Sequence, residues 1–166
     1  MLTKILDWVI DVDVAATLAA YAAIESGRAA GCDCADCRNF VAVRSRVYPE
    51  AFVKFAHSAG IDLEREVELA CSGLVGIGAT EYTGLFHLVG RLVEGPADVE
   101  QMDSSSWRVL YRSLAPGFSV AAGFGQGALD KAFAGLPLVD VNWEVTTDWV
   151  IPDPPTPGIA RLRGSQ

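Results

Sequence analysis

The chain has 166 residues, and its 21 acidic side chains outnumber its 13 basic ones, which gives a formal net charge of −8. Hydrophobic residues make up 51% of the chain, which is too large a fraction for a disordered protein. A chain of this length can bury roughly 70% of its unfolded surface, so it needs neither disulfides nor a metal to hold a core. Because an acidic chain repels phosphate backbones, the charge argues against binding to nucleic acid.

The first residues lack the pattern of an export signal. Asp7, Asp11 and Asp13 interrupt the apolar stretch at the N-terminus, whereas a signal peptide has an unbroken apolar core. No run of about 18 uncharged apolar residues follows, so we expect no contact with a membrane. We therefore predict a cytoplasmic protein whose four cysteines are reduced thiols or metal ligands rather than disulfides.

The N-terminal half predicts one strand followed by helices. Alternation over residues 4–12 indicates a half-buried strand whose apolar face carries Trp8 and Ile10. Helical spacing and capping residues then predict three helices, Val14–Ser26 capped by Asp13, Ala35–Val47, and Pro49–Ser58 with its end at Gly60.

From residue 61 onward the pattern is mostly that of strands. We expect them at residues 61–71, Tyr82–Val93, Trp107–Leu114, Phe118–Phe124 and Leu138–Thr146, with an exposed loop over Glu94–Ser106. In the first of these strands Glu64, Glu66 and Glu68 indicate a solvated face. The prediction is therefore a single α+β domain over residues 1–152, with the N-terminal strand and helices packed on a mainly antiparallel sheet that the C-terminal half forms. Residues 153–166 are proline-rich and predict a loose tail.

Three cysteines lie close together in the segment GCDCADCRNF. Zinc is held by thiolates at about 2.3 Å in a tetrahedron, and a loop that enters a helix can supply several of them. The N-terminus of the helix would also stabilise thiolate charge. The predicted zinc ligands are Cys32, Cys34, Cys37 and, from a distant part of the chain, Cys71, with His87 or His57 as alternatives for the last position.

Two other interpretations of the cluster stay open. The cysteines can be plain reduced thiols at the start of a helix, with Cys37 facing the core. Alternatively, Cys34 and Cys37 form a C-x-x-C pair that could carry out redox chemistry. The redox interpretation is weaker because Asp33 and Asp36 should raise the pKa of the neighbouring thiols, and the preceding element is helical rather than a strand.

The two histidines have ordinary interpretations as well. His57 falls on the side of its helix away from Phe52 and Phe55, which is typical of an exposed surface histidine. His87 lies in the middle of a strand beside Leu85, which is typical of a hydrogen-bonded core histidine.

The cysteine motif also carries a resemblance. GCDCADCRNF, then YPEAFVKFAHSAGID and EYTGLFHLVGRLVEG, resembles an uncharacterised family of small bacterial proteins with a C-x-C-x-x-C-x-N-F signature. The likeness covers about the middle half of the chain. It implies a fold and a metal but no reaction, and the residues that it carries over are Cys32, Cys34, Cys37, Asn39 and Phe40. Cys71 lies outside the motif.

We therefore predict a non-catalytic interaction or regulatory protein, with a structural zinc site and another protein as its partner. The alternative is a thiol- or metal-dependent enzyme, redox or hydrolytic, that uses the same cysteines.

Overall fold

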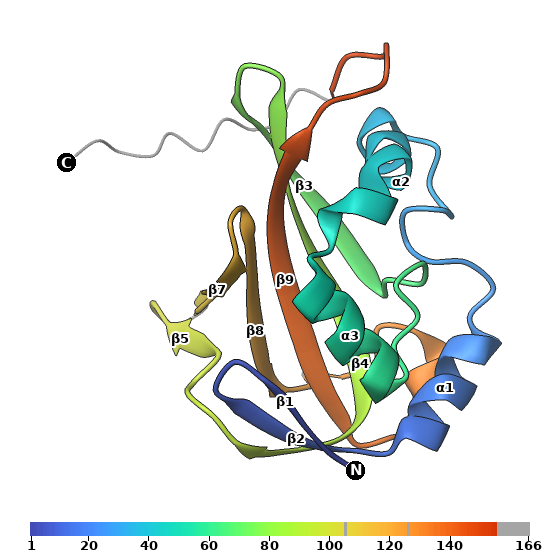
Figure 1. Cartoon of the computed structure of the whole chain (residues 1–166), viewed down its shortest axis with the longest axis vertical. Helices are drawn as coiled ribbons and strands as arrows, with labels where there is room; N and C mark the ends of the chain where they lie inside the picture. Colours follow the sequence, from blue (N-terminus) through green and yellow to red (C-terminus); the bar gives the residue numbers. More distant parts are fainter. Residues whose placement is uncertain (105, 126, 156–166) are drawn as a thin grey trace.

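The computed structural model describes residues 1–104, 106–125 and 127–155 (Figure 1). In chain order its elements are β1 (Leu2–Ile5), β2 (Trp8–Val12), α1 (Val14–Ala23), α2 (Ala35–Val47), α3 (Glu50–Ala59), β3 (Glu68–Gly76), β4 (Ala79–Glu94), β5 (Val99–Gln101), β6 (Trp107–Val109), β7 (Arg112–Ala115), β8 (Phe118–Phe124), the 3-10 turn η1 (Lys131–Phe133) and β9 (Leu138–Asp148). Every strand pairing within these residues is antiparallel. The predicted α+β class is confirmed.

One large sheet and one small one make up the β structure. The large sheet has the order β1-β2-β4-β9-β8-β7, with β3 also paired to β4, and β5 and β6 form a separate two-stranded arm. Figure 1 shows α2 and α3 lying across the long strands β4 and β9. Alternate residues of these strands, such as Phe86 and Trp143, are buried beneath the helices. The residues between them, such as Thr83 and Glu144, define what we call the outer face of the sheet.

An aromatic cluster fills the space between the helices and the sheet. The Trp143 indole stacks on Phe40 of α2 with ring centroids 5.5 Å apart and on Phe118 of β8 at 6.4 Å. Gly84, which pairs with Trp143 across the sheet, leaves the room for this indole: a Cβ added there would lie 2.1 Å from a Trp143 ring carbon. A glycine in the middle of the longest strand is therefore a packing requirement.

The change Gly84→Ala is expected to lower the free energy of unfolding by about 3 kcal/mol, because the extra methyl group overpacks a core that cannot move aside. Urea unfolding followed by tryptophan fluorescence measures the effect. Gly76→Ala is the matched control, since nothing lies within 4 Å of a Cβ added at Gly76. Equal midpoints for the two variants would contradict the packing argument.

Helix α1 closes a gap in the edge of β4. On this edge β2 pairs with β4 from Gly90 onward and β3 pairs only as far as Leu85, so the backbone between them has no strand partner. The Tyr21 hydroxyl donates to the His87 carbonyl at 3.0 Å, and the Val89 N–H donates to the Thr17 hydroxyl at 3.1 Å. Side chains of α1 thus replace the missing strand.

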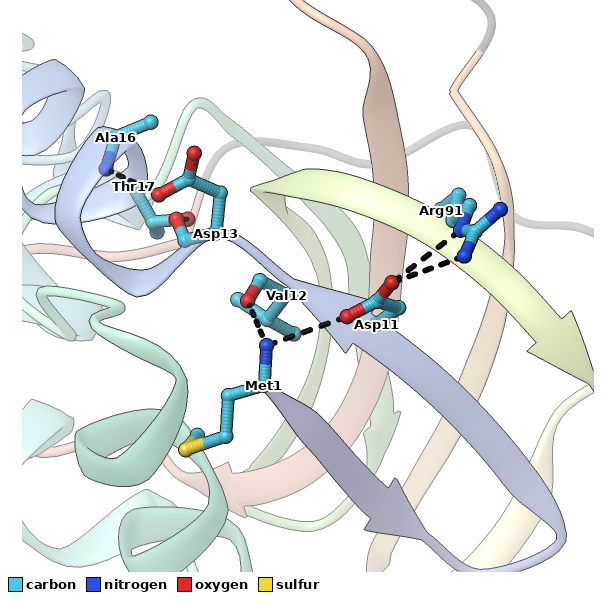
Figure 2. Close-up of polar contacts among 7 residues, drawn as sticks. All are labelled: Met1, Asp11, Val12, Asp13, Ala16, Thr17 and Arg91. Atoms are coloured by element: carbon cyan, nitrogen blue, oxygen red, sulfur yellow. Dashed lines mark hydrogen bonds and ion pairs between the residues drawn. The ribbon is translucent and has the colours of Figure 1, made fainter.

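The N-terminal segment forms a hairpin, β1–β2, rather than the predicted single strand over residues 4–12. Leu6 has a positive φ of 49°, and the chain reverses between Ile5 and Trp8. The prediction was wrong because the apolar alternation continues through the turn. Figure 2 shows how the hairpin ends: the Met1 amine donates to the Asp11 carboxylate at 3.2 Å and to the Val12 carbonyl at 2.7 Å.

Next to the hairpin, the start of α1 matches its prediction. The Asp13 carboxylate accepts the Ala16 N–H at 3.0 Å and caps the helix, as Figure 2 also shows. The same view places Arg91 of β4 on the other carboxylate oxygen of Asp11, at 3.2 Å. The Met1 ammonium group and the Arg91 guanidinium group lower the pKa of Asp11 through hydrogen bonds and charge.

Helix α2 has its predicted bounds, and α3 ends at Gly60, whose φ of 80° suits glycine. Other boundaries differ. Helix α1 ends at Ala23, before the predicted residue 26. Strand β3 begins only at Glu68, not at residue 61, and continues to Gly76, past the predicted end at residue 71. The predicted strand Trp107–Leu114 is split into β6 and β7, and β5 lies inside the predicted loop.

The predicted C-terminal tail lies mostly outside the described residues, which end at residue 155. Of its first residues, Asp153 contacts the domain: its carboxylate pairs with Arg38 at 3.0 Å and its carbonyl accepts the Trp149 indole N–H at 2.7 Å.

Candidate metal centre

The loop between α1 and α2 brings three cysteines to one point. The sulfur atoms of Cys32, Cys34 and Cys37 all lie within 4.8 Å of one another. Cys32 and Cys37 are half-buried, whereas Cys34 is exposed to solvent. All four cysteines of the chain are free thiols. Three of the four proposed ligands therefore lie close together, in an arrangement that is compatible with a metal site.

Local hydrogen bonds explain why the three sulfurs meet. Cys34 is the N-cap of α2, and its Sγ accepts the N–H of Cys37 at 3.4 Å. Before the cap, a tight turn in which the Cys32 N–H donates to the Ala29 carbonyl at 3.2 Å folds the loop back. The Cys32 thiol then lies 3.4 Å from Cys34 Sγ. The helix start thus places a sulfur where a capping oxygen usually lies.

The pKa values of Cys32 and Cys37 are shifted in opposite directions. Hydrogen bonds from the backbone of Cys34 and from the neighbouring thiols lower the pKa of Cys32. Burial, followed by hydrogen bonds and charge from the other two sulfurs, raises the pKa of Cys37. Without a cation the cluster therefore favours a thiolate at Cys32 over a thiolate at Cys37. A bound cation would attract all three as thiolates, since metal binding releases thiol protons.

The distant candidates for a further ligand do not join this group. Cys71 lies on β3, where its thiol is 3.4 Å from the Thr80 hydroxyl, and its pKa is raised, mainly by burial. It is not among the described residues whose ligand atoms lie within 4.8 Å of one another. Charge and hydrogen bonding from Asp36, in the first turn of α2, also raise that pKa, so Cys71 faces the start of the same helix.

The histidines have other surroundings. His87 is fully buried: its Nδ1 lies 2.7 Å from Asp140 Oδ1, and its Nε2 accepts the Leu129 N–H at 3.1 Å. An accepting Nε2 places the ring proton on Nδ1, so both nitrogens are engaged. His57 is exposed on α3. We therefore place neither histidine in the cysteine cluster.

The first turns of α2 tie the cluster to the end of the sheet. Asn39 is fully buried; its amide donates to the Tyr82 hydroxyl at 3.1 Å and the Asp148 carbonyl at 3.2 Å, and its oxygen accepts the Val150 N–H at 2.7 Å. The Tyr82 hydroxyl in turn donates to the Asp36 carbonyl at 2.8 Å. The loop, α2 and the end of β9 thus meet at one junction beside the three sulfurs.

A buried carboxylate beneath the loop was missed by the sequence analysis. Glu66 is 1% exposed, although alternation indicated a solvated face, so that prediction was wrong. Its Oε1 accepts the Ala29 N–H at 2.6 Å and pairs with Arg44 of α2 at 3.1 Å, and its backbone carbonyl accepts the Arg28 N–H at 2.9 Å. Burial raises the pKa of Glu66, against the opposing effect of these partners. Glu66 thereby fixes the segment that leads into the cysteine turn.

No family model, curated protein or solved structure matches this chain. The resemblance to the bacterial family with the C-x-C-x-x-C-x-N-F signature therefore stays a prediction. Within the described residues, none of the helices is long and apolar enough to span a membrane.

Proposed function

We propose that the protein is a non-catalytic interaction or regulatory protein of the cytoplasm in which Cys32, Cys34 and Cys37 hold one zinc-type ion. The observation that carries the metal is the convergence of three sulfurs within 4.8 Å at the start of a helix. Sulfur ligands select soft or borderline ions such as Zn²⁺ over Mg²⁺ or Ca²⁺. The fourth position would face solvent beside the exposed Cys34, or would take a further side chain after a local movement.

A structural role fits the position of the cluster. The ion would fix the turn that precedes α2 at the junction where Asn39 joins α2 to Tyr82 and to the end of β9. The two hollows on the outer face of the sheet, which are described below, are lined by residues other than these three cysteines. A catalytic ion needs an open coordination position next to a place for substrate. This arrangement favours a structural metal ion over a catalytic one.

Metal removal tests the structural role. We expect anaerobically purified protein to contain one zinc ion per chain and to protect three thiols from alkylation. After chelation, hydrogen exchange should increase in the first turn of α2 and around Asp148, while α3 stays unchanged as an internal control. Protein without metal, or exchange that is identical with and without it, would contradict the proposal.

The second candidate is a thiol enzyme, favoured by one observation. The sulfurs of Cys32 and Cys34 are 3.4 Å apart, and the lowered pKa of Cys32 favours its thiolate, the nucleophilic form, beside a second sulfur. Such a pair could exchange with a disulfide substrate, in which two thiols become one disulfide as the substrate disulfide is reduced to two thiols. Metal-free protein equilibrated with glutathione buffers near the cytosolic potential would then contain a disulfide between these residues. Thiols that stay reduced there would exclude this candidate.

A further inference from the structure

The outer face of the sheet is hollowed beneath the β5–β6 arm. One hollow of about 880 Å³ is bounded by Trp107, Arg108 and Val109 of the arm and by residues of β3, β4 and β9. A second, of about 360 Å³, is bounded by Val99 and Val109 of the arm and again by these strands. Both include Val109, so they adjoin each other. We call the two hollows together the outer groove.

The outer groove is acidic along its length. Its lining includes the carboxylates Glu68, Glu81, Asp98, Asp140 and Glu144. Among its described lining residues the only cation is Arg108, which forms an ion pair with Glu100 on the neighbouring strand of the arm. Three of these carboxylates affect the same side chain, Tyr111. Burial is the largest cause that raises the pKa of Tyr111, to about 12, and the charges of Glu144, Glu81 and Glu68 raise it further.

Aromatic side chains line the same groove and face solvent. Trp107 is 63% exposed at one end, and Phe124 is 68% exposed at the other. Tyr111 lies between the arm and the sheet. These exposed rings add apolar area to a groove whose other lining is largely acidic. Aromatic rings beside carboxylates are, in addition, the surroundings that a guanidinium or ammonium group prefers.

The geometry of β9 sets the shape of the ligand. Glu68 lies level with Asn142 across the sheet, Glu144 lies two residues further along β9, and Glu81 lies level with Thr146, two residues further again. The outer face therefore presents a carboxylate at every second residue of extended chain, about 7 Å apart along the strands. An extended segment with a basic side chain at every second residue has the same repeat. A compact cation could neutralise only one part of such a groove.

We propose that the outer groove binds an extended, basic segment of a partner protein, with arginine or lysine at alternate positions. The inference rests on the proposed role as an interaction protein and adds the chemistry of the partner. Opposite charges and exposed aromatic rings give the groove both attraction and contact area. The cysteine cluster lies elsewhere, on the loop before α2, and lines neither hollow.

The test uses three probes. The first is a labelled eight-residue peptide of alternating arginine and threonine, the second has the same composition in two blocks, and the third is spermidine. We expect the alternating peptide to quench Trp107 fluorescence and to bind about fivefold more tightly than the block peptide, because only the alternating form matches the strand repeat. Its affinity should fall with added salt. Equal affinity for both peptides, or spermidine binding as tightly, would overturn the proposal.

Matched variants locate the site. Glu81→Gln with Glu144→Gln should weaken the peptide about tenfold. Glu25→Gln with Glu94→Gln removes the same charge from exposed positions outside the groove and should change the affinity less than about twofold. If both double variants lost the same peptide affinity, only the net charge of the protein would matter, and the proposal would be overturned.

The same samples separate this inference from the proposed metal centre. Zinc content is measured in parallel with peptide binding. If the protein contains zinc but does not bind the peptide, only the proposal about the outer groove is overturned. If the protein binds the peptide but contains no zinc, only the proposal about the metal centre is overturned.

Discussion

The change Cys37→Ser is expected to weaken zinc binding by roughly a hundredfold or more, because apparent binding free energies of about 10–16 kcal/mol in small zinc domains are shared among only four ligands. Cys37 is the proposed ligand that belongs to the first turn of α2, so its loss separates the ion from the helix. Competition with a chromophoric zinc chelator measures the affinity directly. Serine keeps the size of the side chain and removes only the thiolate.

Cys71→Ser is the matched control for this experiment. It removes one thiol from the chain but lies outside the group of three sulfurs, so we expect zinc affinity close to that of the unchanged protein. An equal loss in both variants would mean that Cys71 completes the tetrahedron, as the sequence alone predicts. That result would contradict the three-cysteine arrangement.

The change Glu66→Ala is expected to lower the free energy of unfolding by about 3–5 kcal/mol, because removing one partner of a buried ion pair leaves the other charge uncompensated. Arg44 is the residue left behind, and the Ala29 N–H loses its acceptor. Urea unfolding gives the loss in stability. Because Ala29 begins the cysteine turn, zinc affinity should decrease as well.

Two further variants separate the causes of this loss. Glu64→Ala changes an exposed neighbour and should cost less than about 0.5 kcal/mol. Glu66→Gln keeps an acceptor for Ala29 but cannot ionise. Because burial raises the pKa of Glu66 above its ordinary value of 4.5, ionisation opposes folding, so the unchanged protein should lose stability relative to Glu66→Gln as the pH rises from 4.5. If the difference in stability between the unchanged protein and Glu66→Gln did not vary with pH, the assignment of Glu66 as a buried group that ionises would be contradicted.

The sequence predicts the fold class and the central helices because their signals are local. Gly60 ends a helix, Asp13 starts one, and the pattern over Ala35–Val47 is fully helical. The closeness of the three sulfurs could be predicted for the same reason, since six consecutive residues at the start of α2 contain all three cysteines. Their meeting also depends on the cap at Cys34, which the structure shows and the sequence analysis did not predict.

The features that the sequence does not predict depend on distant contacts. Glu66 alternates with exposed acids, and only the folded chain shows that Arg44 and Ala29 surround it. In α1 Leu18 is 56% exposed, whereas Thr17 and Tyr21 are buried against the open edge of β4. A local sequence pattern cannot indicate that this edge of β4 lacks a strand partner, because the edge lies about seventy residues away from α1 in the chain. Contacts with distant segments therefore decide which face of the helix is buried.

The most direct test of the metal centre is X-ray absorption at the zinc edge on the purified 166-residue chain. Three sulfur atoms at about 2.3 Å and one lighter ligand are the coordination shell that Cys32, Cys34 and Cys37 would supply together with solvent. A shell built only from nitrogen and oxygen, or protein that takes up no zinc under anaerobic conditions, would contradict the proposal that these three cysteines hold a metal ion.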